Sequence, residues 1–73
     1  MEEFKSISKQ IGLNFRHART KKGYTQEKFA EIANVHVNYI GKIERGEQNL
    51  TIKSMVELSN SLNTPTKDIL SIN

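Results

Sequence analysis

The sequence contains no cysteine and only one proline among its 73 residues, and it has no apolar run long enough to cross a bilayer. Without cysteine, neither disulfides nor a thiolate zinc site can stabilise so small a domain. The absence of a signal-peptide pattern and of a membrane segment indicates a protein of the cytoplasm. We expect one domain with a thin core and no separate sensor domain, so self-association becomes the expected source of further stability.

The residues that catalysis or a cofactor would need are also missing. The sequence has no serine, histidine and acid in a catalytic order, no glycine-rich phosphate loop and no metal-ligand spacing. The two histidines, His17 and His36, have no cysteine and no organised carboxylate beside them. We therefore expect no enzyme activity, no cofactor, no metal site and no small-molecule ligand.

Charge alone does not identify a partner. Eleven lysine and arginine residues against eight aspartate and glutamate residues give a formal net charge of +3. An excess of this size is compatible with a phosphate-rich partner, but it is common among proteins with other partners. The assignment of function must come from the pattern of residues.

Apolar spacing predicts an all-α protein of five helices without strands. Residues 1–6 are expected to form a polar lead-in, and residues 7–73 a single domain. The first helix carries its apolar side chains on one face, at Ile7, Ile11, Phe15 and Ala18. The helices are expected over about residues 8–22, 26–33, 36–44, 52–63 and 65–71.

Local signals mark the ends of these helices. Thr25 and Thr51 are expected to accept hydrogen bonds as N-caps, and Thr64 to do the same before Pro65 at the first position of the last helix. Asn34 ends the second helix, since asparagine tolerates the left-handed conformation that a tight turn needs.

The most informative segment covers about residues 25–45, two short helices joined by a tight turn, which is the arrangement of a helix-turn-helix. Ala30 is expected where the two helices approach most closely. The expected core positions are Phe29, Ala33, Val35, Ile40 and Ile43. The opposite side of the third helix carries Val37, Asn38, Gly41, Lys42 and Arg45. Such a face suits a major groove, and we expect Gly41 to allow a close approach to DNA.

Several pieces of the chain together resemble the phage-repressor and Cro-type (XRE) family. They are Arg16, Arg19, KGYTQE at residues 22–27, Tyr39-Ile40, IERG at residues 43–46 and NLT at residues 49–51. The resemblance covers about residues 11–70. It implies a five-helix, lambda-repressor-like DNA-binding domain that binds a two-fold-symmetric operator as a homodimer, with the third helix in the major groove.

The resemblance also implies roles for individual residues. The base-contacting positions are His36, Val37, Asn38 and Lys42, although the family more often has a hydroxyl or amide residue at the position of His36. The expected DNA backbone contacts are Gln26, Arg45, Gln48, Asn49, Lys22 and Tyr39. Arg19 and Glu44 occupy positions that form an ion pair in similar proteins. We expect that pair to be structural.

The expected dimer interface lies on the fourth and fifth helices, because their apolar side chains exceed what so small a core can absorb. Its predicted members are Met55, Leu58, Ile69, Leu70 and Ile72. Ile69 and Leu70 are also expected to face inward from the fifth helix. Leu13 projects from the first helix away from its apolar face, which is ordinary for a single leucine but is also compatible with a contact surface.

These features predict a sequence-specific transcriptional regulator. Within the family, ER at residues 44–45 and NLTIKS at residues 49–54 resemble the controller proteins of restriction-modification systems. Repressors of phages or mobile elements and antitoxin-like autoregulators share the scaffold, so the controlled operon stays open. Activation and repression are not distinguished, and RNA polymerase remains a candidate partner. The alternative function is a protein-interaction module that pairs with another regulator or with the transcription machinery.

Overall fold

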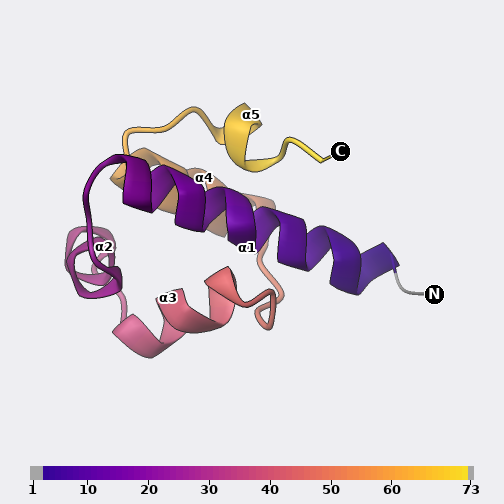
Figure 1. Ribbon diagram of the computed structural model, residues 1–73, viewed down its shortest axis with the longest axis horizontal. Helices are drawn as coiled ribbons and strands as arrows, with labels where there is room; N and C mark the ends of the chain where they lie inside the picture. The colour runs from indigo at the N-terminus through magenta and orange to yellow at the C-terminus, as the bar shows by residue number, and fades with distance from the viewer. Residues whose placement is uncertain (1–2, 73) are drawn as a thin grey trace.

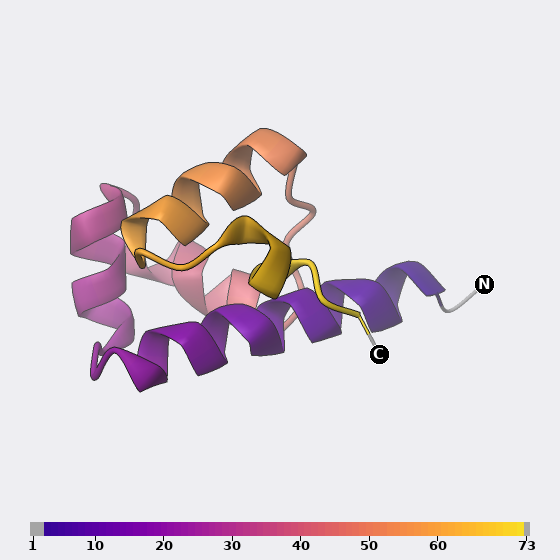
Figure 2. The same cartoon turned by 90° about the horizontal axis from the view of Figure 1, so that it is seen from above.

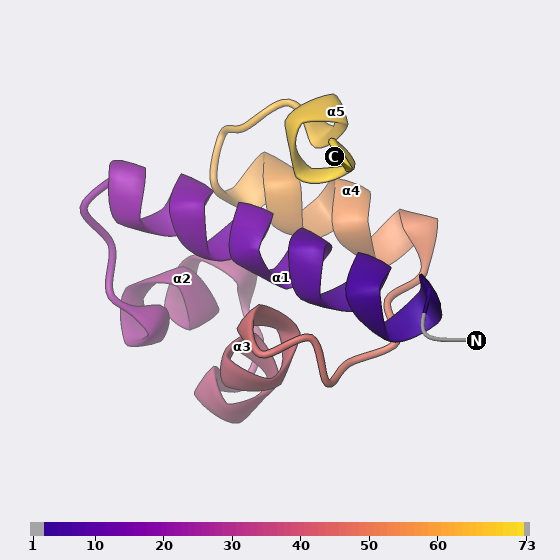
Figure 3. The ribbon, with the colours of Figure 1, turned by 45° about the vertical axis from the view of Figure 1, so that its right-hand side comes forward.

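The computed structural model describes residues 3–72, which fold into five α-helices (Figure 1). They are α1 (Glu3–Lys21), α2 (Gln26–Ala33), α3 (Val37–Glu44), α4 (Ile52–Ser61) and α5 (Thr66–Ile69). No strand occurs in this part of the chain, so the all-α, five-helix prediction is confirmed. In Figure 3, α2 and α3 lie on one side of α1, and α4 and α5 lie on the other. None of the helices within residues 3–72 is long and apolar enough to span a membrane.

The helix starts that the sequence predicted are present at α2 and α4. The hydroxyl of Thr25 accepts a hydrogen bond from the backbone N–H of Lys28 at 3.0 Å. Thr51 accepts one from the N–H of Ser54 at the same distance. Each hydroxyl satisfies one of the amide groups that the first helical turn leaves without a partner.

The ends of α1 to α4 have a backbone conformation in common. Each is followed by a residue with positive φ, and these are Gly23, Asn34, Gly46 and Asn63. After α3, the N–H of Gly46 donates to the carbonyl of Ile43 at 3.0 Å, and that of Glu47 to the carbonyl of Lys42 at 2.9 Å. This pair of bonds is the Schellman motif, which fixes the direction of the chain beyond the helix. The left-handed conformation predicted at Asn34 is confirmed, with φ of 58°.

The prediction of a lead-in is wrong for residues 3–6, which belong to α1. Residues 1, 2 and 73, which the predicted lead-in and domain include, lie outside the described residues. The first half of this helix packs against the loop after α3: a β-carbon at Gly46 would lie 2.7 Å from Cγ and 2.8 Å from Cα of Lys9. Phe4 and Ile7 line a hollow that they share with Leu50. These contacts join distant parts of the chain, so local composition gave no sign of them.

The last two helices are shorter than predicted. α4 ends at Ser61, and α5 covers only Thr66–Ile69. Pro65 precedes α5 instead of occupying its first position, and no side chain caps this helix. The hydroxyl of Thr64 donates instead to the carbonyl of Leu62 at 3.2 Å. Leu70 therefore follows the helix and is exposed, which corrects the prediction that it faces inward.

The core lies between α1 and the other four helices. Its buried apolar residues are Phe15, Ala18, Phe29, Ala30, Ile40, Ile43, Met55, Leu58, Leu62 and Ile69. The rings of Phe15 and Phe29 are tilted against each other with centroids 6.3 Å apart. The predicted core positions Phe29, Ile40 and Ile43 are buried, while Ala33 and Val35 pack at its edge.

This core uses three of the five residues predicted for the dimer interface. Met55 is 8%, Leu58 4% and Ile69 1% exposed. That part of the prediction is wrong, because these side chains are already buried in the core of their own chain and are not available to a second chain. Leu70 and Ile72 remain exposed, at 37% and 45%.

The C-terminal segment is fastened to α1. The side-chain amide of Asn14 donates to the carbonyl of Ile69 at 2.8 Å and to the carbonyl of Ser71 at 2.9 Å. Its oxygen accepts a hydrogen bond from Gln10 at 3.0 Å. Figure 2 shows α5 and the segment after it returning to α1. Asn14 thereby holds the exposed apolar end of the chain in place.

Candidate nucleic-acid interface

α2 and α3 form the helix-turn-helix, connected by residues 34–36. The N–H of Val35 donates to the carbonyl of Ala30 at 3.0 Å, which closes the turn against α2. Ala30 is 4% exposed, as expected for the position where the two helices approach closely. The short turn and the small side chain together fix the angle at which α3 leaves α2.

α3 presents one face to the core and another to solvent. Ile40 and Ile43 are buried, and Asn38 and Lys42 are exposed one turn apart. Val37 and Tyr39 are only half-exposed and pack against the edge of the core. Among the predicted base-contacting residues of the helix, Asn38 and Lys42 are therefore the freest to reach a partner.

His36 is the N-cap of α3. Its Nδ1 accepts a hydrogen bond from the backbone N–H of Asn38 at 3.0 Å. A ring nitrogen that accepts carries no proton, so in the neutral imidazole the proton is on Nε2. The exposed ring can thus cap the helix with one nitrogen and donate to a partner with the other.

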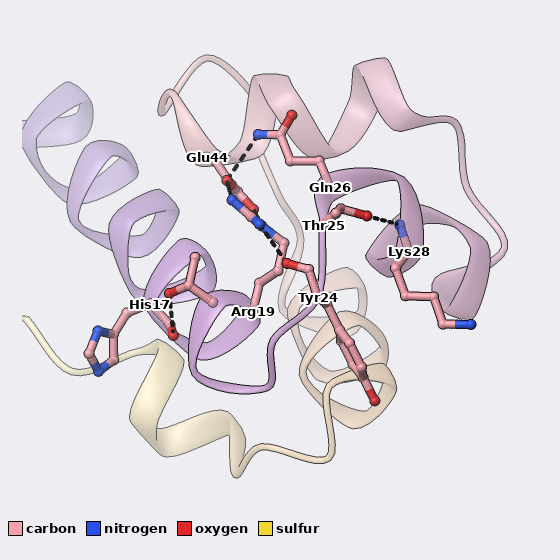
Figure 4. Close-up of polar contacts among 8 residues, drawn as sticks. His17, Arg19, Tyr24, Thr25, Gln26, Lys28 and Glu44 are labelled. Carbon is pink, nitrogen blue, oxygen red and sulfur yellow. Dashed lines mark hydrogen bonds and ion pairs between the residues drawn. The ribbon is translucent and has the colours of Figure 1, made fainter.

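A buried polar network joins α1, α2 and α3 (Figure 4). Arg19 donates from Nε and Nη2 to the two carboxylate oxygens of Glu44, at 2.7 and 3.0 Å. Its Nη1 donates to the carbonyl of Tyr24 at 2.8 Å. The side chains of Arg19 and Glu44 are only 11% and 3% exposed. The predicted structural ion pair is confirmed, and the bidentate geometry suits the burial of both charges.

Gln26, predicted to contact the DNA backbone, belongs to the same network. Its amide nitrogen Nε2 donates to Glu44 at 3.0 Å, so the carboxylate accepts bonds from two elements at once. A side-chain amide has two N–H groups, and one of those of Gln26 is left for another acceptor. The residue pattern predicted each of the two residues but gave no sign of the bond between them.

Arg45 and Glu47 form a second ion pair, on the surface. Arg45 donates from Nε to Glu47 at 3.0 Å and from Nη2 at 3.3 Å. The hydrogen bond and charge of Glu47 raise the pKa of Arg45, and the hydrogen bond from Arg45 lowers the pKa of Glu47. Arg45 was predicted from the sequence and Glu47 was not, although a glutamate two residues after an arginine is a visible signal for such a pair.

Gly41 lies beneath this pair. A β-carbon there would be 3.0 Å from Nη1 of Arg45 and 3.9 Å from the side-chain oxygen of Gln26. The residue is on the outer side of α3, as expected, but it is buried. Since the guanidinium of Arg45 lies over it, Gly41 does not offer the open surface for a close approach to DNA that was predicted from the sequence.

The remaining predicted backbone contacts lie around this surface. Lys22 is exposed where α1 ends, and Asn49 is exposed in the loop after α3. Gln48 is half-buried and lines the hollow that contains Phe4. The loop that carries Arg45, Gln48 and Asn49 is thus supported by α1.

Comparison with known proteins points to one family. Residues 15–69 match the model of the family described as "Helix-turn-helix". The chain is 36% identical over 67 residues to the control protein C.SmaI of Serratia marcescens, covering 92% of this chain and 80% of that protein. It is 35% identical over 51 residues to the control protein C.BamHI of Bacillus amyloliquefaciens, covering 70% and 63%.

Comparison of the fold with solved structures also finds a controller protein. The crystal structure of the restriction-modification controller protein C.AhdI from Aeromonas hydrophila superposes with a TM-score of 0.78 at 28% identity. The match covers 84% of this chain and 92% of that one.

Proposed function

The chain belongs to the helix-turn-helix family of transcriptional regulators, and we propose that it binds a specific DNA operator as a homodimer. It is a DNA-binding regulator, from a family of regulators and not of enzymes. Its relatives C.SmaI, C.BamHI and C.AhdI are control proteins, the last of a restriction-modification system. We therefore propose that the controlled operon encodes a restriction-modification system, including this chain itself.

The observation that carries this proposal is the exposed outer face of α3, together with the buried ion pair that holds this helix against α1. Asn38 and Lys42 point away from the core, while Arg19 and Glu44 fasten the same helix to α1. An asparagine side chain can pair with the edge of adenine in two hydrogen bonds, and a lysine can reach guanine or a phosphate. A rigidly held helix with such side chains is suited to reading a major groove.

Base reading is proposed for the residues at the start and outer face of α3. Asn38 and Lys42 would make the central contacts, Val37 would touch a thymine methyl group, and His36 would donate from Nε2. Val37 is half-buried, so only part of its side chain can contribute.

Phosphate contacts are proposed for the residues around α3. The free N–H of Gln26 at the start of α2 points to such a role, because helix N-termini favour anions. The other proposed contacts are Lys22, Tyr39, Arg45, Gln48 and Asn49. Each phosphate neutralised by a cationic side chain should make the slope of log K against log salt concentration more negative by about 0.9.

In the proposed dimer, two chains meet through the exposed apolar residues of α4 and of the segment that follows α5. Leu70 and Ile72 are exposed apolar residues held against α1 through Asn14, and Val56 is exposed on the adjacent α4. A two-fold dimer would present two copies of α3 to the same side of the duplex, with half-site centres about 10 to 10.5 base pairs apart. We propose that the concentration of the dimer itself controls operator occupancy. The cytoplasm is the proposed location, and RNA polymerase is a proposed partner when the protein acts as an activator.

Selection of bound sequences from a random duplex library tests this function. Enrichment of a pseudo-palindrome, followed by salt-dependent binding of the selected duplex, is the expected result. If folded, dimeric protein enriches no sequence and instead binds a protein partner in a salt-insensitive way, the chain is an interaction module and the proposal is wrong.

A further inference from the structure

Arg45 is a cation in the surface that is proposed to meet DNA, and its guanidinium is already bound by the carboxylate of Glu47. Arg45 directly follows α3, and its guanidinium uses Nε and Nη2 to bind the two oxygens of Glu47, at 3.0 and 3.3 Å. Both side chains are largely exposed, at 58% and 55%. The ion pair therefore lies where a phosphate group could reach it.

The backbone holds Glu47 in this position. The N–H of Glu47 donates to the carbonyl of Lys42 at 2.9 Å, as part of the Schellman motif that ends α3. The carboxylate is thus tied to the end of the proposed recognition helix. The hydrogen bond from Arg45 lowers the pKa of Glu47, and the charge of Lys42 adds to this effect, so the carboxylate is ionised at neutral pH.

A carboxylate and a phosphate bind an arginine with the same geometry. Each presents two oxygens that accept parallel hydrogen bonds from one edge of the guanidinium. The edge formed by Nε and Nη2 of Arg45 cannot serve both anions. A phosphate that took this edge would have to displace Glu47, and it would leave an unpaired carboxylate beside the DNA backbone.

We propose that Glu47 competes with DNA phosphate for Arg45 and thereby lowers both the affinity and the salt dependence of DNA binding. This inference rests on the proposed function, and it assigns to Glu47 a role that weakens binding instead of contributing a contact. Its effect is independent of base sequence, since phosphate contacts carry no direct sequence information.

The salt dependence of binding measures how many counterions are released from the DNA, and Glu47 should change that number. When a free arginine neutralises a phosphate, cations condensed on the DNA are released. When the arginine must first leave Glu47, the freed carboxylate attracts a cation, and the net release is smaller. Removal of the carboxylate should restore the full release, and so should steepen the salt dependence by up to about 0.9.

The test uses the Glu47→Gln variant of the full chain, titrated against the selected operator and against a scrambled duplex at several salt concentrations. At low salt we expect binding to become about two- to fivefold tighter, by the same factor on both duplexes, with a steeper salt dependence. Because both side chains are exposed, the thermal unfolding midpoint should stay close to that of the parent protein.

Two further variants separate competition from a general effect of charge. Asp68→Asn makes the same change in net charge on α5, which lies on the other side of α1 from α3 (Figure 1), and should have a much smaller effect. In the background of Arg45→Gln, the change Glu47→Gln should no longer tighten binding. Equal tightening with and without Arg45, or unchanged or weaker binding by Glu47→Gln, would overturn the inference. Failure of the parent protein to select any sequence would instead overturn the proposed function.

Discussion

At the scale of single residues, the proposed DNA-binding surface contains side chains that are free and side chains that already have a partner. Within residues 3–72, the side chains of Asn38 and Lys42 make no hydrogen bond or ion pair that would have to be broken. Gln26 and Arg45 are each bound to a carboxylate, Glu44 and Glu47 respectively. Two of the proposed base contacts, Asn38 and Lys42, are thus free, whereas two proposed phosphate contacts, Gln26 and Arg45, already bind an acidic side chain.

Asn38→Ala should relax base preference at one position in each half-site. The loss of two hydrogen bonds to one base should cost about 1 to 3 kcal/mol on the operator and much less on a mismatched site. Titration of a panel of single-base operator variants measures this difference. Asn60→Ala, an exposed asparagine on α4, is the matched control and should bind like the parent. Equal weakening on every duplex would mean that Asn38 contacts phosphate.

Glu44→Leu should destabilise the fold strongly. It leaves Arg19 buried without its partner, and breaking a buried pair in this way costs about 3 to 5 kcal/mol. The free energy of unfolding in urea measures the loss. The double variant Arg19→Met with Glu44→Leu should recover much of the stability, because neither charge then remains buried. A single variant as stable as the parent would show that the pair does not fasten α1 to α3.

At the scale of helices, the position of α3 depends on how closely α1 crosses it. A β-carbon at Gly12 would overlap the carbonyl oxygen of Ile43 and lie 2.8 Å from that of Glu44. The crossing therefore requires glycine in the middle of α1, where this residue is otherwise unfavourable. The same contact supports the Arg19 and Glu44 pair, so the glycine and the buried ions depend on the same close packing.

Gly12→Ala and Gly41→Ala should have opposite effects on stability. The added methyl group at Gly12 meets rigid backbone and should cost about 1 to 3 kcal/mol by overpacking. At Gly41 it meets the mobile end of Arg45, so the gain in helix propensity, up to about 1 kcal/mol, should prevail. Thermal unfolding of both variants gives the comparison. Destabilisation by Gly41→Ala would indicate that Arg45 cannot move aside.

At the scale of the whole molecule, the small core decides which apolar residues remain for a partner. Met55, Leu58 and Ile69 are used inside the chain, and Leu70 and Ile72 are left on its surface. Asn14 links that surface to α1, and α1 is linked to α3 through Arg19. The proposed dimer face and the proposed DNA face are therefore parts of one rigid unit.

Leu70→Glu should convert the dimer into a monomer at micromolar concentration, because it places a charge in the proposed apolar contact. Operator affinity should fall with it, since two half-sites would no longer be bound together. Sedimentation measures the mass, and Leu13→Glu supplies the matched control at another exposed leucine. A Leu70→Glu protein that remains dimeric would refute this interface. A changed mass for Leu13→Glu would assign the contact to α1.

The sequence by itself determined the features that depend on neighbouring residues. Five helices, the caps at Thr25 and Thr51 and the left-handed turn at Asn34 all follow from hydrogen bonds between residues a few positions apart. The apolar pattern also gave the buried face of α3, at Ile40 and Ile43. The pairing of Arg19 with Glu44, 25 positions apart, came only through the resemblance to a family.

Only the tertiary structure decided the contacts between distant segments. It placed Gln26 on Glu44, α1 against the loop at Gly46, and Asn14 on the carbonyls of Ile69 and Ser71, at and after the end of α5. It also divided the apolar residues of α4 and α5 between the core and the surface. Periodicity identifies the face of a helix that is apolar, but not how much of that face its own chain will cover, because burial depends on how all the helices pack together.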